Sequence, residues 1–337
     1  MQELIVSKAE SGQRLDKLLA RYLNQAPKSF LYKMLRKKNI TRNGSRADGS
    51  ELLAEGDQIR LFLSEDTIRK FRTSVEDREE NLSSASGRIQ VLFETEDVIF
   101  INKPAGILSQ KAKPEDVSMN EEMLSFLLQS GRMKAEDLAF FRPSVVNRLD
   151  RNTSGLIIGG KTLFGLQTMS RLLKERSVGK YYLAIVSGTP SGRRHLTGWL
   201  VKDEASNQVT LSDTQVPGAD PIETEFEPLL SGKGCTLLKV HLITGKTHQI
   251  RAHLAGIGLP VVGDSKYGKA SVNSYMRTTF HAGGLMLHSA QIIFPEFGEE
   301  AVREPRLAAL SGLRVTAPVP AAFAKLEQTL FGTVYEF

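Results

Sequence analysis

A stretch near the first quarter of the chain divides it into two unequal parts. Residues 65–87 contain the run Glu-Asp-Arg-Glu-Glu and then a serine-rich run, and they include few apolar side chains. Segments of this composition bury too little apolar surface to order themselves, and they commonly serve as flexible linkers. At 337 residues the chain is also longer than one ordinary domain. We therefore predict a small first domain, a linker at 65–87 and a larger second domain.

Composition narrows the class of the protein. The chain is 41% hydrophobic and 24% charged, as globular proteins are, and no apolar run approaches the roughly 18 residues of a membrane span. Its start lacks the basic and apolar segments of a secretory signal. Cys235 is the single cysteine, which excludes an intramolecular disulfide and fits a reducing cytoplasm. The net charge of +6 favours a polyanionic partner.

The first part of the chain combines two amphipathic helices with a small hairpin. Apolar residues within 14–23 follow helical spacing, and a second helix is predicted with Ser29 as its N-cap. That helix ends in three cations, Arg36, Lys37 and Lys38. Tight turns are predicted at Asn43–Gly44 and Gly56–Asp57. A cationic helix end beside a hairpin suits contacts to RNA phosphates, but the same cations are also favourable at any helix C-terminus.

From residue 88 onward the sequence is rich in strands. Short β-branched runs predict strands at 89–93, 98–101, 156–158, 181–186, 235–243 and 285–294. Helices are predicted at 163–173, at 247–257 and after Pro320. The charged segment 110–142 is interpreted as a partly helical insertion on the surface. The expected class is α+β, with a largely antiparallel sheet and flanking helices in the second domain.

The stretch Val146–Leu156 places a carboxylate between two arginines. Asp150 follows Arg148 and Leu149 and precedes Arg151, in a polar turn with apolar runs on both sides. A charged aspartate is rarely buried unless it is paired, and loops on a rigid scaffold often carry catalytic groups. Because the same residue types also favour ordinary turns, the residues alone leave both interpretations open.

Two later segments present a tyrosine and an arginine in positions of interest. Period-two alternation in the strand Lys180–Gly188 places Tyr182 on one face and Tyr181 on the other. Tyr182 is then either a core aromatic or a site residue. In the helix 247–257, Arg251 lies next to the apolar stripe and can reach inward or remain at the surface.

Two apparent ligand-binding patterns are rejected. Gly155–Thr162 formally matches the phosphate-binding loop, but its middle residues predict a strand rather than a glycine-rich loop, so nucleotide hydrolysis is not expected. His248 and His253 are off a common helical face, and neither belongs to a glutamate-containing metal motif. No metal site is expected.

The stretch around Asp150 resembles the catalytic-aspartate motif of the RluA-type pseudouridine synthases. The family motif reads His-Arg-Leu-Asp, two variable residues, then Thr-Ser-Gly-Leu, and this chain departs from it once, with Asn147 at the histidine position. Three more segments resemble the same family in the same order: Lys180–Gly188, Thr244–Gly268 and Leu287–Ala290. Residues 11–64 resemble the S-four-type RNA-binding domain. Residues 88–337 would then form the catalytic domain.

The resemblance implies isomerisation of uridine to pseudouridine within an RNA chain. Asp150 would be the nucleophile or base at the sugar, with Arg251 as its ion-pair partner, and Tyr182 would stack on the uracil. The target base would be flipped out of the RNA. Leu287 would form an apolar wall beside it, and Arg148 would fill the vacated space or hold the backbone. The reaction gains no atom, so no cofactor is expected.

Three assignments of the function stay open. Large-subunit ribosomal RNA is favoured by the RNA-binding domain at the front, tRNA is the alternative, and a non-catalytic RNA-binding assembly protein is the third. We expect a monomer in the cytoplasm.

Overall fold

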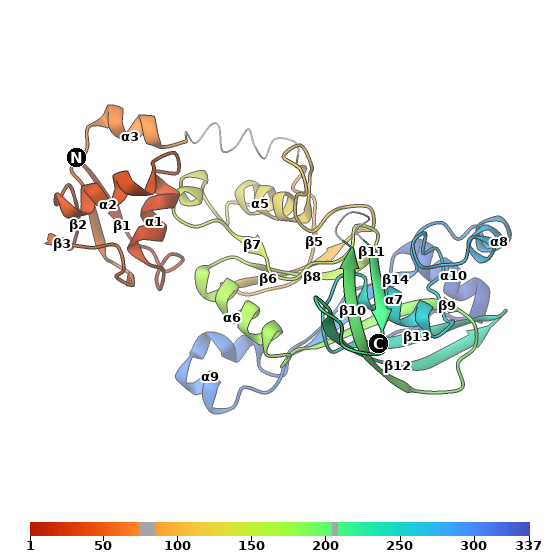
Figure 1. Cartoon of the computed structure of the whole chain (residues 1–337). Helices are drawn as coiled ribbons and strands as arrows, with labels where there is room; N and C mark the ends of the chain where they lie inside the picture. The colour runs from red at the N-terminus through yellow and green to blue at the C-terminus, as the bar shows by residue number, and fades with distance from the viewer. Residues whose placement is uncertain (74–84, 204–207) are drawn as a thin grey trace.

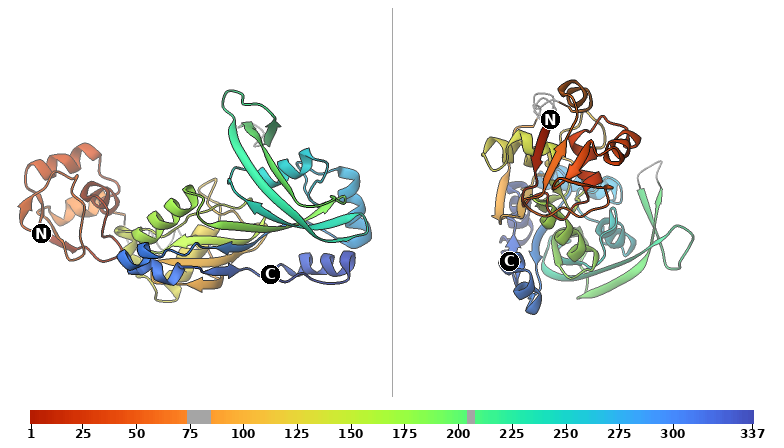
Figure 2. Two further views of the ribbon diagram at one scale, coloured as in Figure 1. Left: turned by 90° about the horizontal axis from the view of Figure 1, so that it is seen from below. Right: turned by 90° about the vertical axis from the view of Figure 1, so that its left-hand side faces the viewer.

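The computed structural model describes residues 1–73, 85–203 and 208–337. A small N-terminal unit lies at one end of an elongated molecule, and a large twisted sheet with flanking helices forms the rest (Figures 1 and 2). The architecture confirms the predicted α+β class. No helix in the described part of the chain combines the length and hydropathy that crossing a membrane requires.

The N-terminal unit packs three helices on a four-stranded antiparallel sheet. Its elements are β1 (Gln2–Ile5), α1 (Leu15–Tyr22), α2 (Lys28–Arg36), β2 (Ile40–Arg42), β3 (Ser45–Arg46), β4 (Gln58–Leu61) and α3 (Glu65–Phe71). The predicted turn at Asn43–Gly44 joins β2 to β3, with both residues at positive φ. The predicted N-cap Ser29 is wrong, because α2 begins at Lys28 and its N-cap is Pro27, two residues before Ser29.

Helix α3 falls inside the stretch that we interpreted as linker. Ser64 caps it by accepting a hydrogen bond from the Thr67 N–H, and Ile68 is buried in the core of the N-terminal unit. The ring of Phe71 packs on Phe30 with centroids 4.7 Å apart. The first turns of this stretch therefore belong to the N-terminal unit. The serine-rich part of the predicted linker falls largely on residues 74–84, which lie outside the described residues.

The second part of the chain is built on one sheet. Within the described residues it contains β5 (Gln90–Glu94), β6 (Val98–Lys103), β7 (Ser144–Val145), β8 (Ser154–Gly160), β9 (Gly179–Ser187), β10 (Arg194–Asp203), β11 (Gln208–Ser212), β12 (Asp220–Gly232), β13 (Cys235–Leu242), β14 (Leu287–Ile293) and β15 (Arg314–Thr316). The main path runs β11-β10-β12-β13-β9-β14-β8-β6-β5. All of these pairs are antiparallel except β8 with β14. The expected largely antiparallel sheet is confirmed, and each predicted strand is present.

Helices cover the sheet and close its ends. They are α5 (Met119–Gln129), η1 (Ala135–Ala139), α6 (Leu163–Lys174), α7 (Gln249–Gly256), α8 (Ala270–Phe280), α9 (Glu299–Arg303), η2 (Pro305–Leu310) and α10 (Ala321–Phe331). The helices predicted around 163–173, 247–257 and after Pro320 correspond to α6, α7 and α10. The interpretation of 110–142 as a surface insertion is wrong for α5, because Met119, Met123 and Leu127 pack into a core against β6 and β8.

The two parts of the chain touch directly. Lys8 pairs with Glu96 at 2.9 Å, and the Leu163 N–H donates to the Ala9 carbonyl at 3.1 Å. The ring of Phe140, which follows η1, stacks on Tyr22 with centroids 5.3 Å apart. These contacts fix the N-terminal unit against the β5–β6 turn, the start of α6 and the end of η1.

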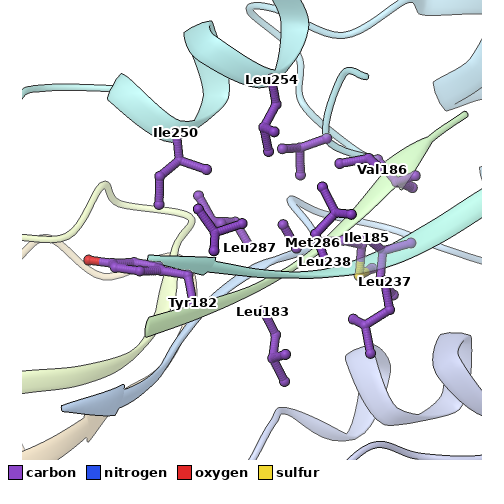
Figure 3. Packing of buried hydrophobic residues seen from close by; sticks show 14 of the residues in the cluster. Tyr182, Leu183, Ile185, Val186, Leu237, Leu238, Ile250, Leu254, Met286 and Leu287 are labelled. Carbon is purple, nitrogen blue, oxygen red and sulfur yellow. The ribbon is translucent and has the colours of Figure 1, made fainter. Parts of the chain in front are cut away.

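The largest core cluster lies on both faces of the sheet, packed against α7 on one face and α10 on the other. Its members include Leu183, Ile185, Leu237, Leu254 and Met286. Figure 3 shows Tyr182, Ile250 and Leu287 at one end of this cluster, with the Tyr182 hydroxyl pointing away from the other labelled side chains. The core therefore ends in a mixed aromatic and aliphatic surface.

The parallel pairing of β8 with β14 requires a glycine. Gly155 on β8 lies opposite Ser289 on β14 and has φ +108, and a Cβ there would overlap the Ser289 carbonyl oxygen. The three atoms nearest to such a Cβ are all backbone atoms of Ser289, which have little freedom to move. A side chain at this position therefore meets both an unfavourable φ and a steric clash.

We predict that Gly155→Ala lowers the free energy of unfolding by about 3 kcal/mol, because overpacking adds to backbone strain. Gly218→Ala is the matched control, since Gly218 also has positive φ but no atom within 4 Å of a Cβ; its loss should be about 1 kcal/mol. Urea denaturation of both variants measures the difference. Equal losses would contradict the packing argument.

Candidate active site

The loop between β7 and β8 carries Asp150, and its backbone is held on both sides of that residue. The Ser109 hydroxyl accepts from the Leu149 N–H and donates to the Leu149 carbonyl, each at 2.9 Å. The Lys103 ammonium donates to the carbonyls of Arg151 and Pro104, at 3.0 Å and 2.9 Å. Burial lowers the pKa of Lys103 to about 8, and the charge of Asp150 partly opposes that shift.

Asn147 anchors the start of the same loop. Its Oδ1 accepts from the Ile158 N–H at 2.7 Å and its Nδ2 donates to the Leu156 carbonyl at 3.4 Å. The Val146 N–H adds a backbone bond to the Ile158 carbonyl at 2.8 Å. The side-chain amide of Asn147 carries an acceptor and donors in one plane. It can therefore bond to an N–H and a carbonyl of β8, as the backbone of a neighbouring strand would. The residue at the family's histidine position therefore fixes the loop in this chain.

Asp150 forms an ion pair with Arg251 of α7. Arg251 Nη1 lies 2.8 Å from Asp150 Oδ2. The side chain of Asp150 is 24% exposed and that of Arg251 is 8% exposed, so the carboxylate faces solvent while its partner lies inside. The predicted pair is thus brought together across 101 positions of sequence.

Asp264 holds the other edge of the same guanidinium. Its two oxygens accept from Arg251 Nε at 2.7 Å and Nη2 at 2.8 Å, and its side chain is fully buried. The backbone N–H groups of Lys266 and Tyr267 donate to Oδ1. Burial acts to raise the pKa of Asp264, but Arg251 and these two N–H groups outweigh it and hold the pKa below its ordinary value.

A histidine and a tyrosine lie beside this pair. His248 Nε2 is 3.8 Å from Asp150 Oδ2, and its Nδ1 is 2.9 Å from the Tyr267 hydroxyl. Burial, partly opposed by Asp150, lowers the pKa of His248. No sequence pattern predicted a role in the site for His248, Asp264 or Tyr267. The signal was present, because Asp264 and Tyr267 share the short segment Gly263–Gly268 that matched the family.

Tyr182 and Leu287 form the apolar side of the site. Both side chains are buried, at 6% and 3% exposure, and Ile250 lies beside them (Figure 3). Burial raises the pKa of Tyr182 to about 12, with a small addition from the charge of Asp150 and opposition from a hydrogen bond with Ser289. The phenol is therefore neutral at physiological pH and presents an O–H group.

The predicted cations are exposed. Arg148 lies two residues from Asp150 and forms no hydrogen bond or ion pair with the residues that the structure describes. Arg36, Lys37 and Lys38 lie at the end of α2 in the N-terminal unit, outside this site. The structure therefore brings Asp150, Tyr182, Arg251 and Leu287 into one region and leaves the three cations at the end of α2 elsewhere.

Two further histidines near the site serve the fold. His253 Nδ1 lies 2.9 Å from the Thr224 hydroxyl, and His288 Nδ1 lies 2.9 Å from the Ser154 hydroxyl. Burial lowers the pKa of each to about 4. Among the residues described by the structure, no three histidine, cysteine, aspartate or glutamate side chains gather in a way that could hold a metal ion.

Comparison with known proteins agrees with this geometry. A family model described as RNA pseudouridylate synthase matches residues 97–256. The ribosomal large subunit pseudouridine synthase C of Pasteurella multocida is 31% identical over 96% of this chain and 92% of its own length. The enzyme of the same name from Haemophilus influenzae is 31% identical over 88% of each chain. The solved structure of human RNA pseudouridylate synthase domain containing 4 aligns with a TM-score of 0.56 at 20% identity, over 75% of this chain and 95% of that one.

The chain belongs to the RNA pseudouridylate synthase family and, within it, to the RluA type. It is an enzyme that isomerises uridine to pseudouridine in RNA. The predicted family and activity are confirmed, and the phosphate-loop pattern is accounted for, since Ser154–Gly160 is the strand β8.

We predict that Asp264→Asn lowers the free energy of unfolding by about 3 kcal/mol at neutral pH, because a buried arginine loses its charged partner. The native pKa of Asp264 is depressed, so its stabilisation is present above the ordinary aspartate value of about 3.9 and is lost as pH falls below it. The difference between wild type and variant should therefore shrink below about pH 4.

Denaturant titrations between pH 3 and pH 7 measure this effect. Asp220→Asn is the control, because Asp220 pairs with Lys246 at 2.7 Å but is 54% exposed. Exposed pairs contribute little, so this variant should follow the wild type at every pH. A gap between wild type and Asp264→Asn that stays constant down to pH 3 would contradict the assignment.

Proposed function

We propose that the enzyme modifies uridines of large-subunit ribosomal RNA and that Asp150 is the group acting at the ribose. The ion pair of Arg251 with Asp150 at 2.8 Å carries this proposal. It orients the carboxylate and sets a cation against the negative charge that both candidate roles of Asp150, nucleophile and base, require. Because Asp264 fixes the guanidinium, the position of the carboxylate is fixed as well.

The two oxygens of Asp150 have different surroundings. Oδ2 faces Arg251 and His248, whereas Oδ1 has no hydrogen-bond partner among the described residues. We assign Oδ1 to the reaction at the sugar. The bond from the anomeric carbon to N1 breaks, the uracil rotates, and a bond forms from the same carbon to C5. N1 gains a proton and C5 loses one, so atoms balance without any cofactor.

Tyr182 and Leu287 supply a surface for the uracil. A buried aromatic ring with an aliphatic neighbour favours stacking of a flat base, and the neutral phenol can donate a hydrogen bond to it. A base inside an RNA helix must flip out to reach this surface. The exposed Arg148 lies close enough in sequence to Asp150 to occupy the vacated space or hold the flanking phosphate.

The choice of ribosomal RNA rests on relatives and on the N-terminal unit. The bacterial relatives compared above carry names that specify the large ribosomal subunit. We propose that residues 11–64 form an S-four-type RNA-binding domain in front of a catalytic domain at 88–337. The exposed cations at the end of α2 would contact phosphates. We also propose that the enzyme works as a monomer in the cytoplasm, where its single cysteine stays reduced.

Tritium release from RNA labelled at uridine C5 tests the chemistry, because the new bond must expel that hydrogen. We expect release from unmodified large-subunit rRNA and its loss in Asp150→Asn by at least about 10³-fold. Unmodified tRNA is assayed in parallel. Release from tRNA alone would replace the proposed substrate, and full activity of Asp150→Asn would refute the proposed role of Asp150.

The salt dependence of RNA binding tests the N-terminal unit. Replacing Arg36, Lys37 and Lys38 with glutamine should weaken binding and flatten the log–log salt slope by up to about three, since each phosphate contact contributes about one. A control variant removes the same charge at the exposed Lys174, Arg303 and Lys325. Filter binding between 50 and 300 mM salt measures both. Equal slopes in the two variants would show that α2 does not contact the phosphates.

A further inference from the structure

His248 occupies a backbone conformation that is unfavourable for histidine. It has φ 54 and ψ 13, in the left-handed region, and it stands at the N-cap of α7 without a side-chain capping bond. Left-handed backbone is unfavourable for a side chain other than glycine. The conformation does place the ring between Asp150 and Tyr267. A local strain next to the reacting carboxylate indicates a role for the ring itself.

The hydrogen bonds of Tyr267 determine which nitrogen of His248 carries the proton. The Val209 N–H can only donate, and it donates to the Tyr267 oxygen at 2.9 Å. The Tyr267 hydroxyl proton then has one acceptor among the described residues, the Nδ1 of His248, also at 2.9 Å. A neutral ring that accepts at Nδ1 carries its proton on Nε2. That N–H faces Asp150 Oδ2.

The opposite tautomer is disfavoured on both sides of the ring. With the proton on Nδ1, the Tyr267 hydroxyl would have no acceptor among the described residues, and the Nε2 lone pair would face a carboxylate. Burial keeps the ring neutral, since it lowers the pKa of His248. The positive charge of Arg251 acts in the same direction.

We propose that His248 is a positioning residue for the isomerisation, and that it presents an Nε2–H donor to Asp150 Oδ2 in a tautomer set by Tyr267. This inference rests on the proposed role of Asp150. The 3.8 Å separation is longer than a hydrogen bond, and catalytic hydrogen bonds commonly shorten when substrate binds. With Arg251, the ring gives Oδ2 two donors, so Oδ1 is the oxygen that turns to the ribose.

The arrangement also connects the site to the edge of the sheet. Val209 lies on β11, which pairs with β10 at the far end of the main strand order. The Val209 N–H therefore begins a chain of polar contacts that continues through the Tyr267 hydroxyl and His248 to Asp150. In this chain, the hydrogen bond that each group receives determines the direction in which it donates the next one.

Single-turnover tritium release and RNA affinity distinguish this role from a structural one. His248→Asn suits the left-handed backbone and keeps a polar group near Tyr267, but it removes the donor toward Asp150. We expect its rate to fall at least tenfold with RNA affinity within twofold of wild type. His248→Gln, whose amide reaches the Nε2 position, should recover most of the rate. Tyr267→Phe should also slow the reaction, because without the hydroxyl no bond at Nδ1 holds the proton of His248 on Nε2.

His281→Asn is the matched control, because His281 is exposed and has nearly the same left-handed backbone, with φ 54 and ψ 29. It should react at the wild-type rate. A wild-type rate in His248→Asn, or a glutamine variant as slow as the asparagine variant, would overturn the inference while Asp150→Asn stays inactive. Activity of Asp150→Asn would instead overturn the proposed role of Asp150, on which this inference rests.

Nitrogen NMR of the wild-type enzyme, labelled in its histidine rings, tests the tautomer without any change to the site. We expect His248 to show a protonated Nε2 and an unprotonated Nδ1. Its resonances are assigned by their shift in Tyr267→Phe, so the measurement stands even if the His248 variants do not fold. A proton on Nδ1 at neutral pH would overturn the inference.

Discussion

The buried ion pair between Arg251 and Asp264 is the contact on which the rest of the site depends. Arg251 reaches Asp150 from a helix 101 positions away in sequence, so the carboxylate is only as well placed as the guanidinium. A buried charge is tolerated when its hydrogen-bonding capacity is satisfied. Asp264 meets that condition, because it accepts two bonds from Arg251 and two from the backbone of its own turn. The turn after α7 therefore orients a side chain that α7 presents.

Asp150 is held both through the backbone of its neighbours and through its own side chain. Its backbone is fixed through the neighbouring residues by Ser109 and Lys103, while its Oδ2 is fixed by Arg251. A carboxylate with both oxygens satisfied would be poorly suited to attack or to accept a proton. One satisfied oxygen and one open oxygen give the orientation and the free lone pairs that the proposed role of Asp150 requires. The parallel pairing of β8 with β14 supports this, because it joins the end of the loop to β14 at Gly155.

The sequence predicted the elements whose pattern is local, and it missed what depends on tertiary contact. Period-two alternation predicted β9 and a β-branched run predicted β13, whereas the stripe of α7 left Arg251 free to reach inward or to remain at the surface. The strand β12 was missed because glutamates alternate with its inward residues Ile222, Thr224 and Phe226, which gives a charged composition. Helix α5 was misread for a related reason: Glu122 is buried but satisfied by bonds from the Ser86 side chain and the backbone of residues 86–87. Partners so far apart cannot be recognised from spacing.

The residues that break local rules gather around Asp150. His248 has a left-handed backbone, Lys103 and Asp264 are charged groups in buried positions, and Tyr267 links a strand-edge N–H to the histidine ring. Each is unfavourable in isolation, and each is compensated by one of the others or by the loop they hold. Sequences that otherwise agree with their fold depart from local preference mainly at functional sites. The coincidence of these departures is therefore an argument for the site independent of family motifs, and it includes residues that the motifs alone left without a role.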